Sequence, residues 1–158
     1  MQKYITEAIV LKNLNYGDSH KFYSLLTKDH GKVSALAMGV RKISSRRAGN
    51  LDSLNHVTVR ITESSKGFKT INEVKTVNSF KYCKSNLNSI YYALKFAESV
   101  EYSIEQDHAL PEIFYLLLTA LENLNYREEP HKLIELWFLL GLCDTLGFKI
   151  DLETCAGC

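Results

Sequence analysis

The sequence predicts a small five-stranded β-barrel followed by a unit of three helices. Near residues 78–84 the spacing of apolar residues changes from the alternation typical of strands to the three- and four-residue spacing typical of helices. The charge changes sign at the same place. Residues 1–80 carry 13 lysines and arginines against 6 acidic residues, whereas residues 81–158 carry 6 against 12. We therefore expect two domains, 1–80 and 81–158, that face different partners.

Five strands separated by turn residues are expected in the first domain. The segment HVTVRIT (56–62) alternates cleanly and places Val57, Val59 and Ile61 on one face. Gly31 is expected to supply the positive φ that a tight turn needs. Five strands are too few for an immunoglobulin sandwich and suit a small, strongly bent barrel, for which the OB-fold is the obvious candidate. The expected strands are 5–14, 20–27, 32–38, 56–62 and 68–77.

Three apolar stripes at helical spacing predict the helices of the second domain. Pro111 and Pro130 precede the second and third stripes, where proline is tolerated best, and Gly147 is expected to end the last helix. Together the stripes exceed what three short helices can bury among themselves, so we expect the helices to dock on the barrel. The stripes begin at Leu87, Ile113 and Leu133.

The segment VRKISSRRAG (40–49) concentrates four positive charges between the third and fourth expected strands. A solvated surface loop is one interpretation. A basic groove beside a small barrel is also how OB-folds track a phosphate backbone, with aromatic side chains stacking the bases. Aromatic candidates for stacking are Tyr4, Tyr16, Phe22, Tyr23 and Phe68, most of which we expect in the core. The residues expected to contact nucleic acid are Lys21, Lys32, Arg41, Lys42, Arg46 and Arg47.

The segment CAGC (155–158) has the spacing of half a zinc site. Two thiolates two residues apart can bind one tetrahedral ion, but a closed structural site needs four ligands. We therefore expect Cys155 and Cys158 alone to bind zinc weakly, and expect no other cofactor. Cys83 and Cys143 lie in apolar helical surroundings and are expected to be packed thiols.

No phosphate-binding loop, dinucleotide-binding motif or nucleophile elbow is found, and no enzymatic activity is expected. A metal-dependent nuclease site built from Asp18, Asp29, Asp52 and Glu63 is disfavoured, because these residues occupy turns and strand ends. The sequence shows no signal peptide and no apolar run long enough to span a bilayer, so a cytoplasmic location away from membranes is expected.

The order of motifs resembles the bacterial recombination and repair mediator family RecO. The resemblance includes Tyr-Gly-Asp-Ser (16–19), Thr-x-x-x-Gly-Lys (27–32) and Gly-x-Arg-Lys-x-x-Ser-Arg (39–46). The segment LCDTLGFKIDLETCAGC (142–158) is similar to the family's Leu-Gly-Phe stretch and first zinc pair. The family's second cysteine pair does not appear in this sequence.

This resemblance implies a non-catalytic protein with an OB-fold that binds single- and double-stranded DNA. It also implies annealing of complementary strands, a zinc site in many members, and help in loading the recombinase together with RecR and single-strand-binding protein. Two other functions stay open from the residues alone. One is an RNA-binding OB module, and the other is a helical protein–protein adaptor for which the barrel is a scaffold.

Overall fold

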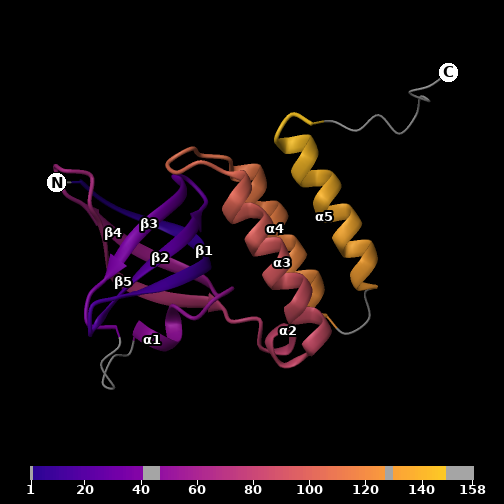
Figure 1. The fold of residues 1–158 in the computed structure, drawn as a ribbon, viewed down its shortest axis with the longest axis horizontal. Coiled ribbons are helices and arrows are strands. Elements are labelled where there is room, and N and C mark those ends of the chain that lie inside the picture. The colour runs from indigo at the N-terminus through magenta and orange to yellow at the C-terminus, as the bar shows by residue number, and fades with distance from the viewer. Residues whose placement is uncertain (1, 41–46, 127–129, 149–158) are drawn as a thin grey trace.

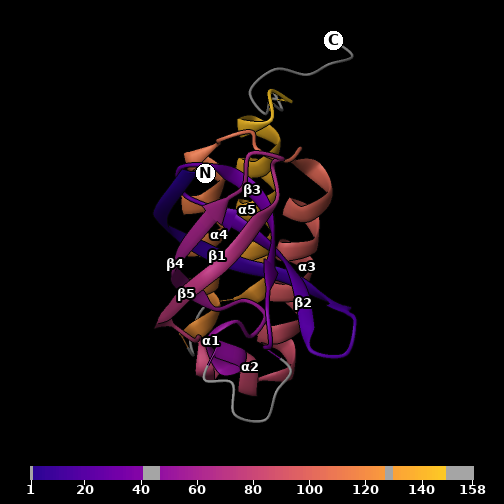
Figure 2. The same cartoon turned by 90° about the vertical axis from the view of Figure 1, so that its left-hand side faces the viewer.

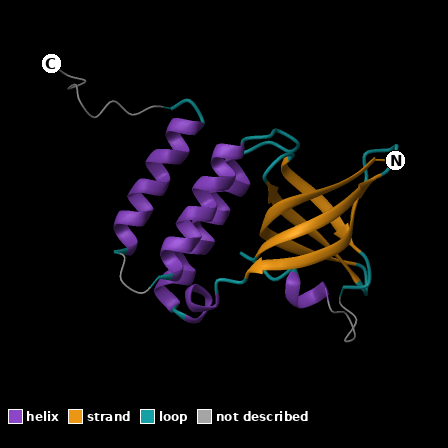
Figure 3. Cartoon of the chain, turned by 180° about the vertical axis from the view of Figure 1, so that it is seen from behind, coloured by secondary structure: helices purple, strands orange, loops and turns teal. Residues whose placement is uncertain are grey.

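The computed structural model describes residues 2–40, 47–126 and 130–148, and shows a β-barrel beside a bundle of helices (Figures 1 and 3). The strands are β1 (Gln2–Tyr16), β2 (His20–Thr27), β3 (Gly31–Ala37), β4 (His56–Glu63) and β5 (Lys69–Asn78). The helices of the described residues are α1 (Arg47–Asn50), α2 (Lys81–Ser85), α3 (Leu87–Ser103), α4 (Pro111–Asn125) and α5 (His131–Thr145).

The barrel closes because β1 is long enough to pair with two neighbours. Its first half pairs with β4 and its second half with β2, both antiparallel. The register with β2 shifts between Val10 and Lys12, and such a bulge bends a strand and increases its twist. The strand order β1-β2-β3-β5-β4, with α1 between β3 and β4, is that of a five-stranded OB-fold, which confirms the predicted fold class.

The strand pairing of the barrel is weakest between β3 and β5, which share one parallel bridge, Leu36 to Thr70. The connection between α3 and α4 covers the other end of β3, where Lys32 forms a bridge with Gln106. The amide of Asp107 donates to the carbonyl of Lys32 at 2.9 Å. The helical part of the chain therefore supplies a short piece of the barrel wall.

Two apolar cores lie side by side. One fills the barrel and is formed by residues such as Val10, Leu25 and Val59. The other lies among the helices and takes in four residues of the barrel, so the predicted docking of the helices on the barrel is confirmed. Burying each of these side chains stabilises the packing by about 1.5–3 kcal/mol. The four are Ile9, Leu11, Leu26 and Leu54.

The helix ends follow the predicted signals. Pro111 is the first residue of α4, and Pro130 is the residue before α5. After α5, Gly147 has φ of +86° and its amide donates to Asp144, while the amide of Phe148 donates to Cys143. This pair of bonds satisfies the last carbonyls of α5 and ends the helix as expected. The short helices α1 and α2 were not predicted.

Candidate nucleic-acid interface

Both ends of the basic segment 40–49 are held firmly against the barrel. At the first end Val40 is buried, and the amide of Gly39 donates to Nδ1 of His20 at 3.0 Å. At the other end the side-chain amide of Asn55 donates to the carbonyls of Gly49 and Asn50, at 3.1 and 2.9 Å. The segment therefore leaves and rejoins the barrel at defined points. In Figure 2, α1 lies at the same end of the molecule as α2.

Three of the four predicted cations of this segment, Arg41, Lys42 and Arg46, lie outside the described residues. Arg47 is the first residue of α1, and its backbone alone is described. The contacts of these four side chains with nucleic acid therefore stay a prediction.

The other two predicted cations lie in different surroundings. Lys21 is half-buried at the start of β2, and its ammonium donates to the side-chain oxygen of Asn13 at 2.9 Å, so its charge is not cancelled by an acid in this contact. Lys32 is buried, and its ammonium donates to the backbone carbonyl of Glu101 in α3. Lys32 thus holds the helices on the barrel, and we leave it out of the interface.

The outer face of β1, β2 and β3 carries a row of apolar side chains. Leu14 of β1 pairs with Phe22 of β2, which pairs with Leu36 of β3. Tyr16 lies beside this row, with its ring edge-on to that of Phe22 at 5.0 Å between centroids. Leu14 and Tyr16 are 62% and 54% exposed, so the row is open to a partner. We call Leu14, Tyr16, Phe22 and Leu36 the outer row.

The remaining aromatic candidates divide between core and surface. Of the five, only Tyr23 is buried inside the barrel, so the expectation that most of them lie in the core is wrong. The ring of Tyr4 contacts that of His30, with 4.0 Å between centroids and a tilt of 36°. Burial, together with the charges of Glu63 and Asp107, raises the pKa of Tyr4 to about 12. Phe68 is exposed in the turn between β4 and β5, which OB-folds commonly use for ligands.

Most other cations of the barrel are neutralised by acidic neighbours. Lys69 pairs with Asp107 at 2.8 Å, and Lys84 of α2 pairs with Asp52 at 3.1 Å. Within the described part of the chain, Lys66 is in no ion pair and lies exposed two residues before Phe68. Lys3 and Lys75 are likewise exposed and in no ion pair with a described residue, so Lys66 is distinguished by its place beside Phe68 and not by its free charge alone.

Two family models together match almost the whole chain. The model described as "Recombination protein O N terminal" matches residues 1–80, and that described as "Recombination protein O C terminal" matches residues 84–158. The chain belongs to the recombination protein O family.

Curated members of the RecO family are similar along the whole chain. The DNA repair protein RecO of Heliobacterium modesticaldum is 33% identical over 158 residues, which cover all of this chain and 56% of that protein. The protein of the same name from Dehalococcoides mccartyi is 30% identical over 153 residues, covering 97% of this chain and 60% of its own length. That of Myxococcus xanthus is 31% identical over 160 residues, with coverages of 100% and 64%. The chain thus spans about three fifths of the length of these relatives.

The zinc pair expected from the RecO resemblance, Cys155 and Cys158, lies outside the described residues and stays a prediction. The described residues contain no group of three histidines, cysteines or acidic residues placed to hold a metal ion. Cys83 is buried among the helices, and burial raises the pKa of its thiol to about 11. It is the packed thiol that the sequence predicted.

The four carboxylates considered for a nuclease site all lie within the described residues, and they do not form a cluster. Asp29 accepts a hydrogen bond from Thr6, whereas Asp52 pairs with Lys84. In the same described ranges, no helix is long and apolar enough to cross a membrane.

Proposed function

We propose that this chain is a non-catalytic mediator of DNA recombination and repair that binds and anneals single-stranded DNA. Membership of the RecO family supports the role in repair. The observation that carries DNA binding is the exposed outer row on an OB barrel, on the strands next to the basic segment 40–49. Loading of the recombinase is the proposed consequence of that binding.

The geometry suits binding without sequence preference. Side chains such as Tyr16 and Phe22 stack on the faces of bases, and every base has such a face. The cations of the basic segment neutralise phosphates, which also carry no sequence information. Because stacking occupies the faces, the pairing edges of the bases stay open to a complementary strand. This is the arrangement that annealing requires.

Double-stranded DNA, a RecR-type protein and single-strand-binding protein are the proposed further partners, and the cytoplasm the proposed location. These partners and this location rest on the family resemblance. In the relatives, about two fifths of the protein lies outside the part that matches this chain, and this remainder could also make these contacts. Zinc bound by Cys155 and Cys158 belongs to the same proposal.

The outer row is tested by replacing Tyr16 and Phe22 with Ala. Stacking of one base contributes about 1–3 kcal/mol, so the double variant should bind a short oligothymidylate about 5- to 150-fold more weakly by fluorescence anisotropy. The salt dependence of binding should not change, because stacking releases no counterions. Tyr126→Ala is the matched control, since this tyrosine is exposed at the end of α4.

Equal affinities of the double variant and the control would exclude the outer row as the DNA surface. The same titration with oligouridylate of equal length tests the RNA-binding alternative. Tighter binding of RNA than of DNA by the unaltered chain would overturn the proposed function in favour of an RNA-binding module.

A further inference from the structure

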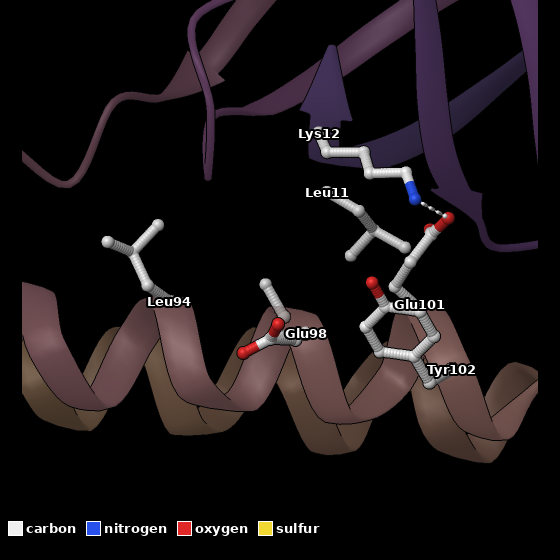
Figure 4. A pocket seen from close by; sticks show the side chains of 7 residues that line it. Leu11, Lys12, Leu94, Glu98, Glu101 and Tyr102 are labelled. Carbon is white, nitrogen blue, oxygen red and sulfur yellow. Dashed lines mark ion pairs between the residues drawn. The ribbon is translucent and has the colours of Figure 1, made fainter. Parts of the chain in front are cut away.

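A pocket of about 220 Å³ lies between the barrel and the exposed side of α3 (Figure 4). Its floor is apolar and is formed by Leu11, Leu94 and Ala97. Figure 4 shows Lys12 extending from β1 toward Glu101 of α3, to which a dashed line joins it, while Glu98 and Tyr102 also project from α3. The volume is below the roughly 300–1,000 Å³ typical of sites for small molecules and cofactors. It is suited instead to a single side chain of a partner.

The charges around the pocket leave one carboxylate without a counter-ion. Glu101 is satisfied within the chain: it pairs with Lys12 at 2.9 Å and accepts a hydrogen bond from Ser24 at 2.5 Å. Lys12 also lies over the ring of Tyr102 at 5.6 Å. Glu98 is exposed and makes no ion pair with any described residue. A cation that entered the pocket would therefore find Glu98 available.

The pocket opens onto an exposed apolar stripe along α3. Leu87, Tyr91, Leu94 and Tyr102 are 84%, 60%, 48% and 76% exposed. With Glu98 they recur at spacings of three and four residues, so they lie on one face of the helix. Exposed apolar side chains gathered on one face of a helix are a candidate interaction site. We call this stripe and the pocket the α3 groove.

We propose that the α3 groove binds an amphipathic helix of a partner protein, which inserts a lysine or arginine side chain into the pocket. The aliphatic stem of that side chain would lie on Leu11, Leu94 and Ala97, and its charge would meet Glu98. The apolar face of the partner helix would cover the stripe. DNA is disfavoured here because Glu98 repels phosphates. The pocket adjoins the outer row, because Lys12 and Leu14 lie two residues apart on the same face of β1, but the proposal does not depend on DNA binding.

The experiment is a display selection of random peptides of about 15 residues, about 22 Å long as a helix, against the whole 158-residue chain. The enriched peptides are titrated against the chain, the variant Glu98→Lys and the control Glu122→Lys. Glu122 is an exposed glutamate on α4, so both variants make the same charge change on a helix surface. Thermal melts check that both variants fold.

Enriched peptides should share a lysine or arginine at one position and lose at least tenfold in affinity for Glu98→Lys, but not for the control. Exchanging that basic residue for Glu should restore binding to Glu98→Lys. Three outcomes would overturn the proposal. These are no peptide with Kd below about 100 μM, peptides insensitive to Glu98→Lys, and tighter oligothymidylate binding by Glu98→Lys than by the control, which would make the groove part of a DNA path.

Discussion

At the scale of single residues, Gly31 meets two separate demands. Its φ of +67° is a conformation that side chains disfavour. A Cβ added there would also lie 2.0 Å from the carbonyl oxygen of His108, in the connection between α3 and α4. The sequence predicts the first demand from the turn, but the second arises from a segment more than seventy residues away.

The variant Gly31→Ala should therefore destabilise the chain well beyond the cost of a strained turn. The positive φ costs roughly 1–2 kcal/mol, and the displaced backbone of His108 should bring the loss in unfolding free energy to about 3 kcal/mol or more. The measurement is urea denaturation. Gly17→Ala is the control, since Gly17 has φ of +58° and an added Cβ meets nothing within 4 Å. Equal losses in the two variants would show that the approach of His108 is unimportant.

The candidate site residues were predictable where strand alternation decides their orientation. Tyr23 shares a face with Leu25 inside the barrel, so its neighbour Phe22 must point outward, as observed. For Lys32, only its positive charge suggests that it contacts nucleic acid. Alternation places it outside the barrel as well, but the outer surface there is covered by α3, and its ammonium is bound to Glu101. Sequence reasoning identifies the outward face, but not which part of that face is covered by a distant helix.

At the scale of elements, the proposed DNA binding depends most on the four cations of the basic segment 40–49. Replacing Arg41, Lys42, Arg46 and Arg47 by Ala should weaken single-stranded DNA binding equally for all sequences. If each cation contacts one phosphate, the slope of log affinity against log salt should flatten by about 3, at roughly 0.7 per contact. Anisotropy titrations at several salt concentrations measure this slope.

The control for that experiment replaces four lysines by alanine at exposed positions away from the segment. One of these is Lys132 of α5. Both variants should keep the melting temperature of the unaltered chain. An unchanged slope in the segment variant would show that these cations do not contact phosphates and that the segment is only a solvated surface loop.

The terminal cysteine pair should bind zinc only weakly in this chain. Cys155 and Cys158 supply two ligands of the four that a structural site needs. Cys83 cannot supply a third without unpacking the helices, and its raised pKa of about 11 keeps it protonated at neutral pH. Dialysis against a chelator, followed by metal analysis, should leave far less than one zinc per chain. Full retention, lost on Cys155→Ser, would show that other ligands complete the site.

The strands β2 to β5 begin and end within one residue of the predicted ranges, because their apolar spacing is regular, whereas β1 extends beyond the predicted 5–14 at both ends. The short helices were not predicted, for reasons that lie in tertiary contacts. The helix α2 has five residues and follows Phe80, which is fully buried and holds a positive φ of 47°. Packing imposes that conformation on a residue type that does not favour it. Such a short segment gives no periodic signal.

At the scale of the whole molecule, the core of the helices extends across the join onto the barrel. Phe80 and Cys83 at the join belong to the helical core, together with Ile9, Leu11 and other barrel residues. Lys84 at the same place is held by Asp52 and Asn55. The two parts should therefore unfold together.

Limited trypsin digestion tests this cooperativity. Lys66, exposed in the turn between β4 and β5, should be cut before Lys81 or Lys84, because the join must unpack before it can enter a protease. Mass spectrometry of early fragments gives the order, and heat denaturation should show a single transition. Rapid cleavage at the join that releases two folded fragments would contradict the expectation.

The bridge between Gln106 and Lys32 protects the chain from self-association through a strand edge. A strand with a free hydrogen-bonding edge recruits other strands and seeds aggregation. Here β5 protects one end of β3, and the connection between α3 and α4, held by the salt bridge from Lys69 to Asp107, protects the other. Loosening that connection would expose the edge of β3, so self-association that increases with concentration should accompany the loss of stability.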